Sequence, residues 1–190
     1  MLRPLLSAAA VLVLATPAAA QMQTPAERLS AEREAMKPLA WMDGRWEGPA
    51  YRVDRGGRHE MTQTERIGPF LDGAVKVLEG KSLGPDRRPA GFNAFGTISF
   101  DPEAKAYTLH SYAQGYAGDF PLTVTPDGYV WEVPAGPTTK MRYTAVFKAG
   151  TWVETGVITG PDAPSGEVFR MTLTRLGDTD WPAAGGAGSR

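Results

Sequence analysis

The sequence predicts an all-β protein, folded as an antiparallel up-and-down barrel of about eight to ten strands with a short N-terminal helix. Three observations predict this class. From residue 45 onward, apolar and polar residues alternate with the period of a strand. Most of the chain's 22 Gly and 16 Pro residues lie in this region and divide it into short segments. The connections between segments are short, and a long antiparallel meander hides its edges best by closing on itself.

Ten strands follow from the alternation and from the turn residues between them. The turn signals include Asp54-Arg55-Gly56-Gly57 and Ala149-Gly150. In the last strand, Phe169, Met171 and Leu173 share one face, which we expect to point inward. The expected strands are residues 45–53, 58–67, 74–83, 92–100, 105–113, 117–124, 128–133, 139–149, 151–159 and 167–176.

A helical lead-in is expected over residues 21–38, before the barrel region of residues 39–177. Thr24 can cap this helix, Pro25 suits its first position, and Glu27 lies in its first turn. Pro38 is expected to end it. The residues after the barrel, 178–190, are rich in Gly and Ala and are predicted to form a disordered tail.

Residues 1–20 have the pattern of a signal peptide. Arg3 supplies the positive charge, residues 5–15 are apolar apart from one serine, and Ala18 and Ala20 suit signal peptidase. Cleavage is expected before Gln21. The alanine-rich signal is typical of bacteria, so we predict a periplasmic or secreted protein with no membrane span after cleavage.

Composition excludes several classes of function. The chain has no cysteine, which excludes disulfides, thiol nucleophiles and thiolate metal sites. The formal net charge is −1, so the sequence has no excess of basic residues that would indicate a nucleic-acid partner. No metal-binding, nucleotide-binding or serine-hydrolase motif is present.

The two ends of the barrel region resemble a known family of barrels. Leu39-x-x-x-x-Gly44-x-Trp46-x-Gly48 and the closing Thr174-Arg175 resemble the signatures of lipocalins and the wider calycin group. With the motif of residues 73–80, they look like a secreted bacterial family of unassigned function, over about residues 36–177. The resemblance implies that Gly44, Trp46 and Arg175 close the barrel, with the arginine lying across the indole ring.

The related nitrobindins hold haem through a histidine near the C-terminal end. In this chain His59 and His110 are the only histidines, and neither is near that end. We therefore predict no haem and no other cofactor. A metal site built from both histidines with Glu65 or Glu79 is compatible with the strand pattern, but no spacing requires it, and none is predicted.

Five strand residues are candidates for ligand binding. His110 and Tyr112 share one face of their strand, and they would point at a ligand if that face lines the cavity. The alternative is that the histidine faces solvent. Gln63 and Glu65 also share a face, and Trp131 is one of many strand aromatics.

Four glutamates and one arginine lie in the middle of predicted strands, where an inward side chain would need an explanation. We expect each of them to face water. They are Glu65, Glu79, Glu132, Glu154 and Arg142.

The sequence favours a protein that binds a small hydrophobic ligand in the barrel cavity. One alternative is an enzyme acting on a small molecule, with His110 and Tyr112 as acid and base. A second alternative is an envelope protein with a structural or interaction role. No oligomeric state is predicted.

Overall fold

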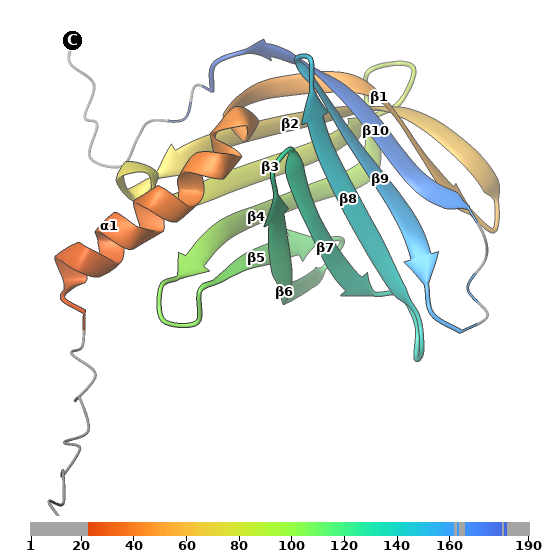
Figure 1. The fold of residues 1–190 in the computed structure, drawn as a ribbon. Coiled ribbons are helices and arrows are strands. Elements are labelled where there is room, and N and C mark those ends of the chain that lie inside the picture. The colour runs from red at the N-terminus through yellow and green to blue at the C-terminus, as the bar shows by residue number, and fades with distance from the viewer. Residues whose placement is uncertain (1–22, 162, 164–165, 180, 182–190) are drawn as a thin grey trace, which may run out of the picture.

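Ten antiparallel strands form one closed barrel (Figure 1). The computed structural model describes residues 23–161, 163, 166–179 and 181. Each strand pairs with its neighbours along the chain, and β1 pairs with β10 to close the barrel. The strands are β1 (Gly44–Asp54), β2 (Gly57–Phe70), β3 (Val75–Leu83), β4 (Pro89–Asp101), β5 (Ala106–Ala113), β6 (Tyr116–Thr125), β7 (Gly128–Pro134), β8 (Lys140–Lys148), β9 (Thr151–Thr159) and β10 (Glu167–Gly177).

This architecture confirms the predicted fold class. Each expected strand is present, and its ends lie within three residues of the prediction. The largest differences are in β2 and β4. Strand β2 continues through Gly68-Pro69 to Phe70, because these residues still pair with β3. Strand β4 begins early, at Pro89, which pairs with Leu83.

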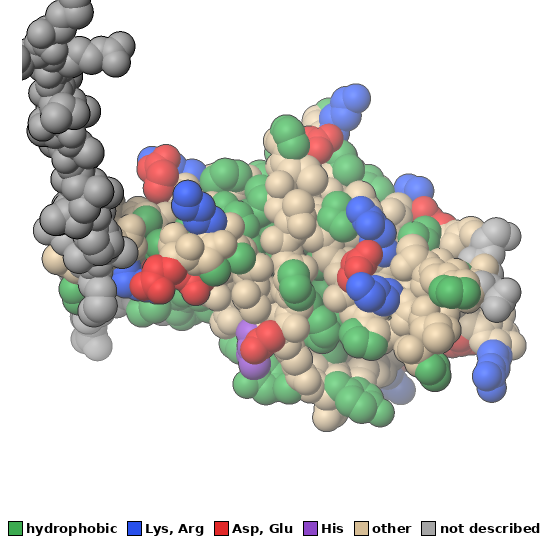
Figure 2. All heavy atoms as spheres, turned by 60° about the horizontal axis from the view of Figure 1, so that its bottom comes forward, with side chains coloured by type: hydrophobic (Ala, Val, Ile, Leu, Met, Phe, Trp, Pro, Cys, Tyr) green, Lys and Arg blue, Asp and Glu red, His purple; other side chains and the backbone are tan. Residues whose placement is uncertain are grey.

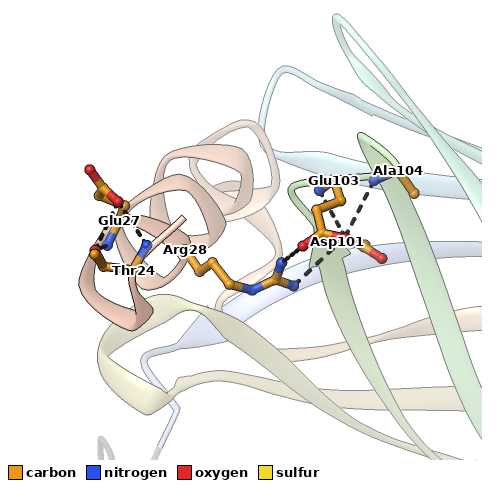
Figure 3. Close-up of polar contacts among 6 residues, drawn as sticks. All are labelled: Thr24, Glu27, Arg28, Asp101, Glu103 and Ala104. Atoms are coloured by element: carbon orange, nitrogen blue, oxygen red, sulfur yellow. Dashed lines mark hydrogen bonds and ion pairs between the residues drawn. The ribbon is translucent and has the colours of Figure 1, made fainter. Parts of the chain in front are cut away.

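The helix α1 (Pro25–Met36) lies over one end of the barrel (Figure 1). Its first turn is held by a capping box, in which Thr24 and Glu27 bond each other's backbone N–H (Figure 3). Arg28 reaches Glu103 in the β4–β5 turn, with 2.7 Å between nitrogen and oxygen. The Tyr107 hydroxyl donates to the carbonyl of Ala35 at 2.6 Å. These contacts attach the helix to that end of the barrel.

A short 3₁₀ helix, η1 (Lys37–Met42), continues from α1 and places apolar side chains at the same end of the barrel. Leu39 and Met42 are fully buried there. Trp41 stacks on Phe147 with ring centroids 5.1 Å apart. Trp46 meets Phe147 and Trp152 edge to face. This aromatic layer closes the end of the barrel that α1 covers.

The first and last strands meet at Trp46 and Arg175, which are partners in the β1–β10 register. The Trp46 indole N–H donates to the Met42 carbonyl at 2.8 Å. The Arg175 guanidinium donates to the Asp43 carbonyl at 3.2 Å. No contact of that guanidinium with the Trp46 ring is found between these two described residues. The pair therefore holds the chain through backbone carbonyls, in place of the ring stacking that the resemblance implied.

Gly44 is required at this corner for two reasons. Its φ is +137°, which side-chain-bearing residues rarely adopt. A Cβ there would also lie 2.7 Å from the Gly177 carbonyl oxygen and 2.8 Å from Arg175 Nε. Any larger residue would push the guanidinium away from the strand junction.

Trp181, which lies in the predicted disordered tail, packs against β2. Its ring is 5.9 Å from that of Phe70, and the Arg66 guanidinium lies 4.4 Å from its centroid. The predicted signal peptide and residues 182–190 of the tail fall outside the described residues. Among the described residues, no helix has the length and apolar character needed to cross a membrane.

Candidate functional site

The register of the strands shows which side chains point into the barrel, because cross-strand partners share a face. Buried Trp46 pairs with Glu65, which pairs with Gly80. On the other side of the barrel, Ala145 pairs with Glu154. Beyond the apolar layer at the closed end, several polar and aromatic residues share the inner face. They are Gln63, Glu65, Ser82, Tyr129, Trp131, Tyr143 and Glu154.

Glu65 is the first of two carboxyl groups on the inner face. The Gln63 amide donates to it at 2.7 Å. Its cross-strand partner is Gly80, and a Cβ on Gly80 would lie 2.7 Å from Glu65 Oε1. The glycine therefore leaves the space that the carboxyl group occupies. Burial raises the pKa of Glu65 to about 8; the Gln63 hydrogen bond opposes this rise, and the charges of Glu154 and Glu79 add to it.

Glu154 is the second inner carboxyl group, and only 6 % of its surface is exposed. The Tyr129 hydroxyl donates to Glu154 Oε2. Burial raises the pKa of Glu154 to about 7, and the hydrogen bonds from Tyr129 and Trp131 oppose the rise. We expected Glu65 and Glu154 to face water, and the register shows that this was wrong for both.

Among the residues that the structure describes, no lysine or arginine forms a salt bridge with Glu65 or Glu154. Lys76 is a buried lysine on the inner face, but its ammonium binds Asp43 at 2.7 Å near the closed end. The raised pKa of each glutamate is the physical result of burial without such a partner. Near neutral pH these groups are able to accept or donate a hydrogen bond, according to their protonation.

Aromatic rings form the wall beside Glu154. Trp131 and Tyr143 stack with centroids 4.6 Å apart, and Tyr143 meets Phe169 edge to face at 5.7 Å. Phe120 lies 5.8 Å from the Trp131 ring. Gly156 pairs with Tyr143, and a Cβ on it would lie 3.1 Å from that ring. The site thus combines two carboxyl groups with flat apolar surfaces.

Several of these side chains lie deep in the barrel but keep accessible surface. Glu65, Trp131 and Tyr143 are each only partly buried by accessible area. Burial nevertheless dominates the pKa of both Glu65 and Tyr143, which it raises to about 8 and about 12. These side chains thus point into the barrel and keep surface that a small molecule can contact. This pattern is what a ligand site in a barrel requires.

The other two predicted ligand residues lie on the outer face. Leu109 points inward, so its neighbour His110 points outward, where it bonds Asp119 on β6. Tyr112 is 51 % exposed, and its ring lies 4.9 Å from that of His110. His110 and Tyr112 therefore point away from any ligand inside the barrel. Figure 2 shows part of the outer surface, where hydrophobic side chains lie exposed among acidic and basic ones.

Gln63, Glu65 and Trp131 all lie on the inner face of the barrel, and their role as ligand residues stays a prediction. Tyr129, Tyr143 and Glu154 join them and were missed. The sequence did indicate that Glu154 points inward, because Glu154 shares a strand face with the apolar residues Trp152 and Ile158. On the outer face, Glu79 forms a salt bridge with Lys81. Glu132 forms salt bridges with Lys140 and Arg142.

The fold and these residues define a closed ten-stranded antiparallel β-barrel with a polar and aromatic layer in its interior. Comparison of structures finds a similar fold in the crystal structure of Rv2717c from M. tuberculosis, with a TM-score of 0.56. The two chains are 11 % identical, and the match covers 75 % of this chain and 97 % of that one. At this identity the likeness shows the fold alone. No protein-family model matches the sequence, and no curated protein matches it significantly.

Proposed function

We propose that the protein binds a small, mainly apolar molecule inside the barrel, with a polar group of that molecule held by Glu65 and Glu154. The observation that carries this proposal is the inner pair of carboxyl groups, Gln63–Glu65 and Tyr129–Glu154, beside stacked Trp131. In a wholly filled core, two inner carboxyl groups without a salt bridge among the described residues would lower stability and bring no benefit.

Flat rings and carboxyl groups together determine the class of ligand. Stacked aromatic side chains favour a flat apolar body, which gains both contact area and ring interactions. The glutamate oxygens favour hydrogen-bond donors such as an amine or a hydroxyl group. A flat molecule with one or two donor groups would satisfy both parts of the site.

The fluorescent probe 1-aminoanthracene has this chemistry, and its emission rises in apolar surroundings. Titration of the full chain should give saturable binding of one probe per protein. Transfer of excitation from Trp131 should report the bound state. Absence of saturable binding would contradict the proposal.

Two glutamate variants distinguish the interior from the outer surface. Glu154→Gln keeps the shape of the side chain but weakens a charge-assisted hydrogen bond, and should lower affinity about tenfold. Glu79→Gln changes a carboxyl group on the outer face of β3 and should leave affinity unchanged. Equal effects of the two substitutions would place the probe outside the barrel.

We further propose that the protein is exported and belongs with the calycin-like secreted barrels that its motifs resemble. Support comes from the signal-peptide pattern of residues 1–20 and from the Gly44, Trp46 and Arg175 corner. N-terminal sequencing of the protein from a bacterial periplasmic fraction should begin at Gln21. Recovery of the intact chain in the cytoplasmic fraction would contradict export.

A further inference from the structure

We propose that the unpaired part of the seam between β6 and β7 is the entrance through which a small apolar molecule reaches the interior. This inference rests on the proposed ligand site. It concerns the path to that site, which the ligand chemistry alone does not determine.

Pairing between β6 and β7 stops part of the way along both strands. It runs from Thr125↔Gly128 to Leu122↔Trp131, although β6 begins at Tyr116 and β7 continues to Pro134. On their other sides, β5–β6 and β7–β8 are paired over the segments that this seam leaves open. Figure 1 shows the two strands diverging from the turn that joins them. The barrel wall is therefore incomplete at this place.

Two prolines explain why the pairing stops. Pro121 directly precedes Leu122, the first residue of β6 that pairs with β7, and Pro134 lies at the end of β7. Proline has no N–H to donate, and within sheets it is confined to places where that side of the strand has no partner. Pro121 still pairs with Thr108 on β5, which leaves the seam as its unpartnered side. The opening is thus encoded in the sequence.

A groove of about 690 Å³ lies along the seam. Its lining includes Asp119, Pro121 and Glu132, which point outward, and Phe120 and Val133, which point inward. Most of the lining residues point outward, and Phe120, Trp131 and Val133 of the inner face also border the groove at the unpaired part of the seam. The apolar members of this lining suit the passage of an apolar molecule.

The groove also leads to the proposed ligand site. Trp131 lines it and stacks on Tyr143 in the interior. Trp131 also lies close enough to Glu154 to oppose the rise in the pKa of that carboxyl group. One side chain therefore belongs to both the groove and the site, so a molecule in the groove lies next to its binding position.

A bulky group attached at the seam tests the entrance. The chain has no cysteine, so Pro121→Cys can be labelled specifically with a maleimide that carries a short polyethylene glycol chain. Pro121 is exposed, and the label should not disturb the core. Arg55→Cys, in the exposed β1–β2 turn at the open rim, is the matched control.

Stopped-flow fluorescence with 1-aminoanthracene should show slower association and slower dissociation for labelled Pro121→Cys than for the same variant without label, on the order of tenfold each. Affinity should change little, because an obstruction of the path alters neither the bound nor the free state. The label at residue 55 should leave both rates unchanged. Equal rates for the two labelled proteins, or a larger effect of the label at residue 55, would contradict the proposal that the seam is the entrance.

A second variant tests the role of the prolines without any label. Pro121→Val with Pro134→Val restores two N–H donors and should allow β6 and β7 to pair further, which slows association in the same assay. Unchanged rates in this variant would also count against the entrance. If the probe binds and its rates do not change, only the proposed entrance is contradicted. If the unlabelled protein shows no saturable binding, both the proposed ligand site and the proposed entrance are contradicted.

Discussion

Replacing Glu65 by glutamine should make the barrel more stable at alkaline pH and leave it nearly unchanged at acidic pH. Burial raises the pKa of Glu65 from 4.5 to about 8. The folded protein therefore keeps a proton that the unfolded chain releases between these two values. As pH rises through this window, wild-type stability falls relative to a variant that has no such group.

The magnitude follows from the pKa difference. One pKa unit corresponds to about 1.36 kcal/mol, so the full shift of Glu65 gives an upper limit of about 5 kcal/mol at pH 8 and above. The measured value should be smaller, because the side chain keeps accessible surface that water can reach. Glu65→Gln resembles the protonated form of the wild type, which is why the two proteins should agree near pH 4.5.

Urea unfolding at a series of pH values measures the effect. The difference in unfolding free energy between Glu65→Gln and wild type should grow steadily from pH 4.5 to pH 8. Glu132→Gln, on the outer face of β7, is the control, because Glu132 is not among the groups that shift the pKa of Glu65, and its stability should follow the wild-type pH profile. Parallel profiles for wild type and Glu65→Gln would refute the assignment of Glu65 as a buried, unneutralised group.

Three further substitutions test the closed end of the barrel by thermal or urea unfolding. Trp46→Ala removes a buried ring and should destabilise the protein by about 3–5 kcal/mol; a change in melting temperature of only a degree or two would contradict its closing role. Tyr107→Phe deletes the bond to Ala35 and should lower stability by about 1 kcal/mol, with α1 more readily cleaved by protease. Thr24→Ala removes the helix cap and should lower stability by about 1 kcal/mol, and no loss would show that α1 contributes little to folding.

The strands were predictable from sequence because each carries its own signal. Alternation sets the period, and turn residues such as Asp54-Arg55-Gly56-Gly57 set the ends. Local signals also predicted the helix cap at Thr24. The end of β2 was missed because Gly68-Pro69 resembles a turn, although pairing with β3 carries the strand through it.

The interior site was less predictable, because alternation gives two faces without stating which is inner. His110 and Tyr112 share a face that proved to be the outer one, since Leu109 takes the inner position. Glu154 was expected outside because buried carboxyl groups are rare. Its burial depends on Tyr129, which is remote in sequence and adjacent only in the folded barrel.

The indole N–H signals of the protein test the central claim most directly. The chain has five tryptophans, and they report from different places: Trp131 from the proposed site, Trp41, Trp46 and Trp152 from the closed end, and Trp181 from the outer face. The Trp131→Phe variant identifies the Trp131 indole signal in ¹⁵N–¹H spectra. During titration with 1-aminoanthracene this signal should shift until binding saturates. The Trp181 signal should not shift. A Trp131 signal that does not move, or shifts confined to Trp181, would contradict a ligand site inside the barrel.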